Sequence, residues 1–231
     1  DDPYWDAGKS DPALPPTYPL PFASMWDLPW VLWEERDIDV FCVFGMTQVM
    51  RPKIRGRVLK LAEKHPQLKV VTAIGHKYPH KEYLGLLGRS RIVVDHQCRG
   101  ADTVRTWEAL AAGACVLSDV AIRQPAPLEP GKHYIQYPRD TSKAGNKQNV
   151  GRFAEILEAT VANWQYAQWI ARQGWDQVRG FHKTTDRARF VLSKAAAHGI
   201  DLGDVSQLVP PDVVQAVRSD ELVRLSTSSE D

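Results

Sequence analysis

The sequence predicts an α/β fold, with a doubly wound, Rossmann-like parallel sheet of about five strands followed by C-terminal helices. Between Ile38 and Pro138, short apolar runs rich in β-branched residues alternate with helical segments. The connections between them are short, which is typical of a parallel sheet with helices on both faces. After Asn149 the pattern is helical only.

Five segments have the length and apolar composition of buried parallel strands. The first, Ile38 to Phe44 (IDVFCVF), ends at Gly45, and the second, Leu68 to Ile74, ends at Gly75. The remaining three are expected at 91–95, 114–120 and 133–138.

Helices are predicted between these strands and after them. Residues 52–65 carry apolar side chains at helical spacing, 80–90 form a short helix, and 103–112 a third. Asp102 or Thr103 is a suitable N-cap for that third helix. Three more helical segments follow at 150–164, 167–181 and 186–199, with interruptions expected near Gly174 and Gly180.

The chain divides into three parts. Residues 1–36 are rich in proline and aromatic side chains, which predicts an extended arm or interdomain linker that lies against its own domain or a partner. Residues 37–199 form the Rossmann-like domain. Residues 200–231 are a polar tail whose end is expected to fray.

Bulk composition excludes several classes of protein. The 231 residues carry 29 Lys and Arg against 28 Asp and Glu, a net charge of +1, so no general nucleic-acid surface is indicated. No stretch has the roughly 20 apolar residues of a membrane span. The three cysteines (Cys42, Cys98 and Cys115) are too scattered for a disulfide framework or a zinc site, and they fit a cytoplasmic protein.

The segment ADTVRTWEALAAGACVLSD, residues 101–119, is the most informative for chemistry. Its helix begins beside a strand's carboxyl end, where open α/β sheets bind ligands, and a helix N-terminus favours phosphate. Arg105 and Glu108 share a helix face, so the carboxylate could take ribose hydroxyls and the arginine a phosphate. Spacing alone favours the alternative, a surface ion pair between these two residues. Gly113 lets the helix stop tightly against the next strand.

A basic group at the start of the first helix is a second candidate. It consists of Arg51, Lys53, Arg55 and Arg57. From the residues alone, phosphate binding and a solvated helix face explain it equally well.

The run SRIVVDHQCRGADTVRTWEALAAGACVLSD resembles the C-terminal, donor-binding domain of GT-B glycosyltransferases, especially the CgeB-like and glycosyl transferase family 1 groups. The family pattern T-x-R-x-x-E-A-x-A-x-G is matched at Thr103, Arg105, Glu108, Ala109, Ala111 and Gly113. DIDVFCVFGMTQVMRPKIRGRVL, EPGKHYIQYPRD and ARQGWDQVRGFHKTTDRARFVL resemble flanking segments of that domain in the same order. The likeness extends from about Asp37 to Ser193.

The resemblance implies that Glu108 holds the donor ribose of a nucleoside-diphosphate sugar and that Gly45 and Gly113 allow close backbone approach. It implies a diphosphate site made of Arg105, Thr103, Asp102, Arg51 and Arg55. No metal or cofactor is expected, because arginine and helix-start amides can stabilise the departing nucleoside diphosphate. Many relatives carry a second, sugar-binding glutamate whose place falls near Gly100, where Asp102 or Asp95 are the candidates to replace it.

Three further residues are candidate site residues, namely His96, His182 and Arg187. For His182, a hydrogen bond at a helix junction is the main alternative. The histidines lack metal-ligand spacing within one element. The series Trp164, Trp169 and Trp175 is interpreted as core or a domain-contact face.

The resemblance covers only one of the two domains of a GT-B enzyme, and the sequence identifies no catalytic base. The main hypothesis is a glycosyltransferase donor domain that works with an N-terminal GT-B domain or a partner chain on an unknown acceptor. One alternative is a non-catalytic nucleotide-binding or assembly module. Another is an enzyme similar to the UDP-sugar epimerases.

Overall fold

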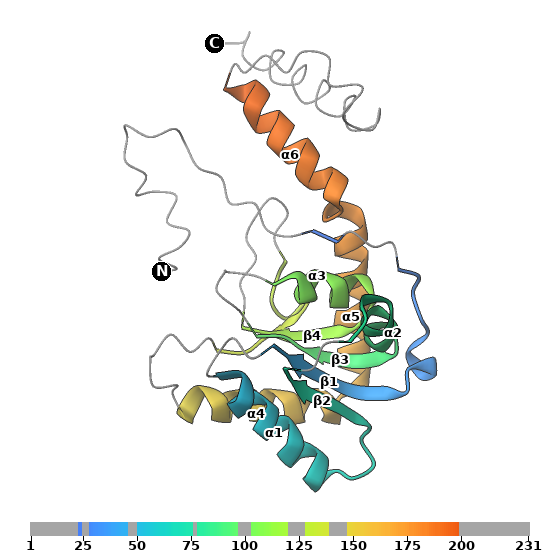
Figure 1. The fold of residues 1–231 in the computed structure, drawn as a ribbon, viewed down its shortest axis with the longest axis vertical. Helices are drawn as coiled ribbons and strands as arrows, with labels where there is room; N and C mark the ends of the chain where they lie inside the picture. Colours follow the sequence, from blue (N-terminus) through green and yellow to red (C-terminus); the bar gives the residue numbers. More distant parts are fainter. Residues whose placement is uncertain are drawn as a thin grey trace.

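The computed structural model describes residues 23–24, 28–45, 50–75, 78–96, 103–119, 128–138 and 147–198. They form a layered α/β domain with an all-parallel sheet between two sets of helices (Figure 1). Asp102, Cys98, Gly100 and the tail at 200–231 lie outside the described residues, as does most of the proline-rich stretch.

The elements follow one another in the predicted order. They are a 3-10 turn at Trp33–Glu35, β1 (Ile38–Phe44), α1 (Met50–Lys64), β2 (Val70–Ile74), α2 (His80–Gly88), β3 (Ser90–Val94), α3 (Val104–Ala111), β4 (Cys115–Ser118), β5 (Ile135–Gln136), α4 (Lys147–Ala162), α5 (Trp164–Phe181) and α6 (Thr184–Ala197).

The strand order is β2-β1-β3-β4-β5, and every neighbouring pair is parallel. Since all five strands run the same way, their carboxyl ends share one edge of the sheet. β5 is shorter than the predicted strand because only Ile135 and Gln136 pair with β4. The interior strand β1 pairs with β2 and β3 and is buried along its whole length.

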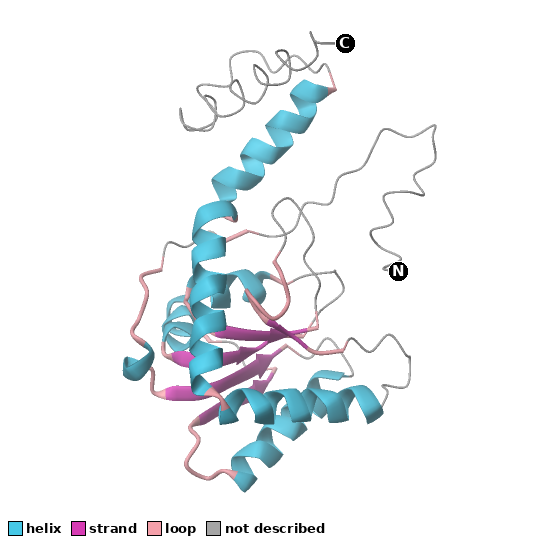
Figure 2. Ribbon diagram, turned by 180° about the vertical axis from the view of Figure 1, so that it is seen from behind, coloured by secondary structure: helices cyan, strands magenta, loops and turns pink. Residues whose placement is uncertain are grey.

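Helices cover both faces of the sheet, as a doubly wound fold requires. α1 and α4 lie on one face and α2 and α3 on the other (Figures 1 and 2). Alternate residues of β1 supply the two cores. Val40 and Cys42 pack with α1 and α4, whereas Phe41 and Val43 pack with α2 and α3. Cys42 is a buried free thiol, and burial raises its pKa to about 12.

Helix α3 ends in a Schellman motif at Gly113, which has φ +73°. The Gly113 amide donates to the Leu110 carbonyl, and the Ala114 amide to the Ala109 carbonyl. A Cβ on Gly113 would lie 2.8 Å from both Arg36 and Trp30. The close approach at Gly113 is therefore to the N-terminal segment, at the amino end of β4.

Part of the predicted arm belongs to this domain. The guanidinium of Arg36 is fully buried and donates to the carbonyls of Ser90 (2.7 Å) and Ala112 (2.9 Å). It also lies against the rings of Trp30 and Trp33. Trp30 in turn meets Trp175 of α5 edge to face. Residues 28–36 thus close the amino edge of the sheet.

The predicted interruption near Gly174 is wrong, because α5 continues unbroken from Trp164 to Phe181, whereas the one near Gly180 is confirmed by the break between α5 and α6. A Cβ on Gly174 would lie 2.3 Å from the His133 carbonyl oxygen. The glycine there allows close packing of α5 on the sheet connection, and tertiary packing outweighs its low helix propensity. Within the described part of the chain, no helix combines the length and apolar character needed to cross a membrane.

Candidate functional site

Asp95 organises the carboxyl edge of the sheet. It follows β3 directly, is fully buried, and its Oδ2 accepts 2.6 Å hydrogen bonds from the hydroxyls of Thr103 and Thr106. Its Oδ1 lies 3.3 Å from an Arg105 nitrogen. These contacts fix the start of α3 to the end of β3. They also occupy both oxygens, which makes Asp95 unavailable as the replacement sugar ligand.

Thr103 is the N-cap of α3. Its backbone is extended, and its side-chain oxygen accepts from the Thr106 amide at 3.3 Å. Of the two predicted caps, the structure selects Thr103, while Asp102 lies outside the described residues. The remaining first-turn amides of α3 point toward the carboxyl edge, where an anion would meet the positive end of the helix dipole.

Arg105 is held by the protein on the same edge. Its Nε donates to the Tyr83 hydroxyl at 3.1 Å, and its guanidinium lies over the Phe44 ring. Burial alone would lower the Arg105 pKa, but Tyr83 and Asp95 together raise it above its usual value. The side chain is thus a permanently charged, fixed cation. Its Nη2 makes no hydrogen bond to any residue that the structure describes.

Glu108 is nine-tenths buried on α3, with a relative exposure of 7%. Burial raises the pKa of its carboxyl group, while His80 and Arg105 act in the opposite direction. Its carboxylate has no hydrogen-bonding partner among the described residues. The predicted alternative, a surface ion pair between Arg105 and Glu108, is wrong, because Arg105 pairs with Asp95 and both side chains are largely buried.

The basic group on α1 divides into buried and outward members. Arg51 is buried over the Phe44 ring and donates to the carbonyls of Gly45 (3.2 Å) and His96 (3.0 Å). Arg51 therefore links the ends of β1 and β3. Arg55 is half-buried, and its Nε has no partner in the described structure.

Gly45 is exposed at the end of β1, and a Cβ there would make only an ordinary 3.7 Å contact with Arg51. Nothing in the described protein requires a glycine at this position. Lys53 is exposed and Arg57 half-buried, so the solvated-face interpretation fits the outward side of α1.

His96 joins the same edge from the end of β3. Its Nδ1 lies 3.0 Å from Asp119 Oδ2 and 3.2 Å from the Tyr137 hydroxyl. The Tyr137 hydroxyl donates to the Asp95 carbonyl at 2.5 Å. His96, Asp119 and Tyr137 follow β3, β4 and β5, so this cluster spans three adjacent strand ends.

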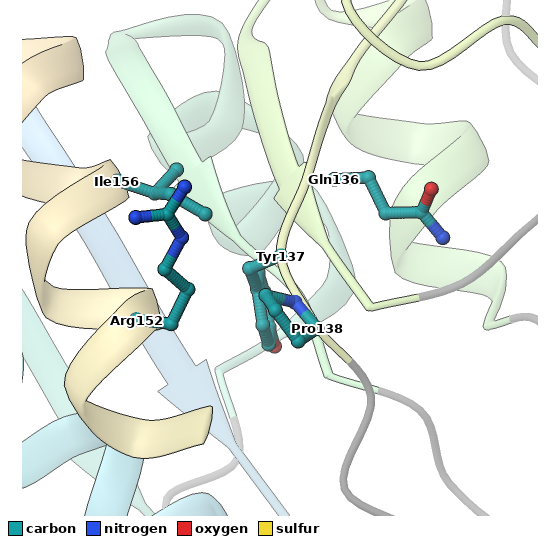
Figure 3. A pocket seen from close by; sticks show the side chains of 5 residues that line it. All are labelled: Gln136, Tyr137, Pro138, Arg152 and Ile156. Atoms are coloured by element: carbon teal, nitrogen blue, oxygen red, sulfur yellow. The ribbon is translucent and has the colours of Figure 1, made fainter. Parts of the chain in front are cut away.

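An open hollow of about 450 Å³ borders Tyr137 on the side of α4. Figure 3 shows Arg152 and Ile156 of α4 on one side of it and Tyr137 and Pro138 on the other. Its position places accessible space beside the β5 end of the polar cluster.

His182 and Arg187 lie apart from this cluster. His182 is the C-cap of α5, and its Nδ1 is 2.6 Å from an Arg187 nitrogen. Both side chains pack on the Trp107 ring. The His182 carbonyl also accepts from the Ser24 amide. The structure thus places this pair at a helix junction, which was the main alternative for His182.

Of the tryptophans Trp164, Trp169 and Trp175, two lie against the domain core and one is on the surface. Trp175 is buried, and Trp164 meets Trp33 edge to face. Trp169 is exposed and stacks on Tyr166.

Sequence reasoning missed Asp119, Tyr137 and Tyr83. Each of them contacts a residue on another strand or helix, so no motif in the neighbouring sequence identifies it as a site residue. A usable signal exists for Asp119 and Tyr137, because both immediately follow a strand and all carboxyl ends share an edge. Among the described residues, no group of three or more His, Cys, Asp or Glu side chains is arranged to hold a metal ion.

Comparison with solved structures identifies the same fold in glycosyltransferases. The C-terminal domain of LpcC, a glycosyl transferase group 1 family protein from Francisella tularensis, has a TM-score of 0.50 at 14% identity, covering 66% of this chain and 91% of that one. The GtfA/B complex has a TM-score of 0.51 at 11% identity, covering 67% and 35%. Pneumococcal O-GlcNAc transferase GtfA, solved with UDP and GlcNAc, has a TM-score of 0.51 at 8% identity, covering 78% and 38%.

These identities are low, so the likeness shows the fold, and this chain spans well under half the length of the two longer relatives. No curated protein matches the chain. A family model described as glycosyl transferase-like matches residues 45–193. Its description does not name the CgeB-like group, so that narrower assignment stays a prediction. The match extends from the end of β1 into α6 and includes the cluster at the carboxyl edge, and the chain therefore belongs to the glycosyl transferase-like family.

Proposed function

We propose that this chain is the donor-binding domain of a glycosyltransferase and binds a nucleoside-diphosphate sugar at the carboxyl edge of its sheet. The observation that carries the proposal is Glu108, a residue with 7% relative exposure whose carboxylate has no hydrogen-bonding partner in the described structure. A carboxylate in a largely buried residue forms strong hydrogen bonds with donors that a ligand brings. A ribose, whose two adjacent hydroxyls both donate, would satisfy it.

The diphosphate is assigned to the N-terminus of α3. First-turn amides and the Nη2 of Arg105, which has no hydrogen bond to a described residue, supply positive charge there, and Arg105 is already fixed by Tyr83 and Asp95. Fixed donors need no reorganisation when negative charge develops on a leaving group. We therefore propose metal-independent transfer, in which these groups stabilise the departing nucleoside diphosphate. Arg55 is a further phosphate candidate.

The acceptor site and a base for the acceptor hydroxyl are assigned to protein outside the described residues. The longer relatives support this, because this chain corresponds to only 35% and 38% of their lengths. An N-terminal GT-B domain or a partner chain would supply these groups.

Calorimetric titration with UDP, GDP and their sugars tests the proposal. We expect at least one nucleoside diphosphate to bind and to raise the melting temperature. Glu108→Ala should weaken that binding by about 2 kcal/mol, roughly thirtyfold in Kd, because it removes hydrogen bonds to a charged group. The matched control is Glu63→Ala, since Glu63 is an exposed helical glutamate near the end of α1, away from the strands' carboxyl ends. Absence of binding by every nucleotide would refute the proposal.

A non-catalytic module of the same fold would pass the binding test but not a transfer test. Release of nucleoside diphosphate from the bound sugar nucleotide, with EDTA present, would exclude that alternative. It would also test metal independence.

A further inference from the structure

We propose that His96 recognises the transferred sugar by accepting a hydrogen bond from one of its hydroxyls at Nε2, and that Asp119 and Tyr137 set the tautomer required for this. The inference rests on the proposed donor site and adds a specificity-determining residue to it. Three strand ends contribute, with His96 after β3, Asp119 after β4 and Tyr137 after β5.

The hydrogen-bond directions determine where the imidazole carries its hydrogen. The Tyr137 hydroxyl has one hydrogen, and it donates that hydrogen to the Asp95 carbonyl at 2.5 Å. Toward His96 the hydroxyl can therefore only accept. The Asp119 carboxylate places a negative charge 3.0 Å from the same Nδ1. Since Nδ1 faces one hydrogen-bond acceptor and a nearby carboxylate, the tautomer with hydrogen on Nδ1 is favoured, and in that tautomer the lone pair is on Nε2.

Burial and stacking also fix the orientation of the His96 ring. It is almost fully buried, at 3% relative exposure, and lies nearly parallel to the Tyr137 ring, with an angle of 13° between the planes. The His96 carbonyl accepts from Arg51. Its Nε2 has no hydrogen bond to any residue in the described part of the chain. A rigid ring with a fixed tautomer and an unused acceptor atom is suited to recognising a donor hydroxyl.

The position of His96 relative to Glu108 indicates which part of the ligand it meets. Glu108 lies on the α2 side of the edge, where His80 and Arg105 influence its charge. The N-terminus of α3, capped by Thr103, provides the phosphate position. His96 instead faces the ends of β4 and β5. A ligand with ribose at Glu108 and diphosphate at α3 has its remaining group, the sugar, on the His96 side.

The β5 side also has room for a sugar. Tyr137, which contacts His96, borders the open hollow of about 450 Å³ next to α4. Figure 3 shows that the apolar wall from Ile156 and the Arg152 side chain face Tyr137 across this space.

Two substitutions separate the roles of the ring nitrogens. His96→Asn retains an N–H donor near the Nδ1 position but removes the Nε2 acceptor. Asp119→Asn places an amide opposite Nδ1, and its N–H would favour the reversed tautomer with hydrogen on Nε2. His65→Asn is the matched control, since His65 directly follows α1, away from the carboxyl ends of the strands.

The experiment measures Kd for UDP and GDP and for their glucose, N-acetylglucosamine and mannose conjugates with the full chain. In the wild type, at least one sugar nucleotide should bind at least threefold more tightly than its parent diphosphate. His96→Asn and Asp119→Asn should abolish that ratio while changing diphosphate affinity less than threefold, and His65→Asn should preserve it. Long-range ¹H–¹⁵N NMR should report hydrogen on Nδ1 of His96 in the wild type and a shift toward Nε2 in Asp119→Asn.

The outcomes distinguish the two proposals. If no nucleotide binds the wild type, the proposed donor site fails. If diphosphates bind but no sugar improves the affinity, or if His96→Asn keeps the improvement, the assignment of His96 is overturned and the donor site stands. Equal loss of diphosphate and sugar-nucleotide affinity in His96→Asn would instead assign His96 to the phosphates and also overturn the inference.

Discussion

The hydroxyl of Thr106 lies 2.6 Å from Oδ2 of Asp95, which joins the first turn of α3 to the end of β3 in the interior of the domain. The same carboxylate faces the guanidinium of Arg105. Replacing Asp95 with Asn would retain the shape but leave Arg105 without its anionic partner. We expect Asp95→Asn to lower the free energy of unfolding by about 3 kcal/mol.

Thr106→Val tests one bond of that cluster and should cost about 1.5 kcal/mol, because it removes a hydrogen bond to a charged group. Thr185→Val on α6 is the control and should stay within about 0.5 kcal/mol of the wild type. Urea unfolding monitored by circular dichroism measures all three variants. Equal stabilities of Asp95→Asn and the wild type would contradict the proposed importance of this junction.

Glu108→Gln should make the ligand-free protein more stable at neutral pH. Burial raises the pKa of Glu108, so the folded state holds its proton more tightly than the unfolded chain does. Stability that depends on this proton is therefore present at low pH and is lost as the pH rises through the raised pKa. The amide has no charge to bury and avoids this loss.

Melting temperatures of the two proteins from pH 4 to pH 8 check this prediction. The advantage of Glu108→Gln should be largest near pH 7 and should shrink toward pH 4. If Glu108→Gln were less stable than the wild type at pH 7, the Glu108 carboxylate would have a stabilising partner within the protein, which would contradict the prediction.

The two glycines of α5 should respond to alanine in opposite directions. Gly174→Ala would place a Cβ 2.3 Å from the His133 carbonyl oxygen, so it should destabilise the fold by about 2 kcal/mol. Gly180 has open space around it, and Gly180→Ala should add about 0.5 to 1 kcal/mol through helix propensity. Thermal unfolding of both variants distinguishes packing from propensity, and the same sign for both would contradict the argument.

The Asp37 carboxylate should titrate well below an ordinary aspartate. Arg89 donates to both of its oxygens, from Nε at 2.7 Å and from Nη2 at 2.5 Å, and this pairing lowers the Asp37 pKa to about 2. The contribution of the pair to stability is present above pH 4 and is lost as the pH falls toward 2. Carboxyl ¹³C NMR titration measures this pKa directly. In Arg89→Ala the value should return toward 3.8.

Local sequence signals predicted the sheet well. β1 matched its predicted bounds because a run of seven residues, apolar except for Asp39, is limited by Asp37 and Gly45. β5 was predicted too long because its length depends on pairing with β4, which local sequence does not encode. The continuity of α5 through Gly174 depends on a contact with His133, 41 positions earlier in the chain.

The helix motif predicted which of the candidate residues share one element. Thr103, Arg105 and Glu108 lie together near the start of α3. The partner of each side chain was not predictable. Arg105 pairs with Asp95 and not with Glu108, and this pairing depends on how β3 lies beside α3 in the folded domain. The positions of Asp119 and Tyr137 depend on strand order, which places the ends of β3, β4 and β5 side by side.

The burial of Arg36 sets a practical limit on how this domain can be isolated. A fragment that begins at Asp37, where the alternating strand pattern starts, would lack Arg36. The carbonyls of Ser90 and Ala112 would then lose their hydrogen bonds from its guanidinium. It would also uncover Trp175. Expression of such a fragment is expected to yield aggregated protein. A start point before Leu28 keeps the cover over the amino edge and should give soluble material.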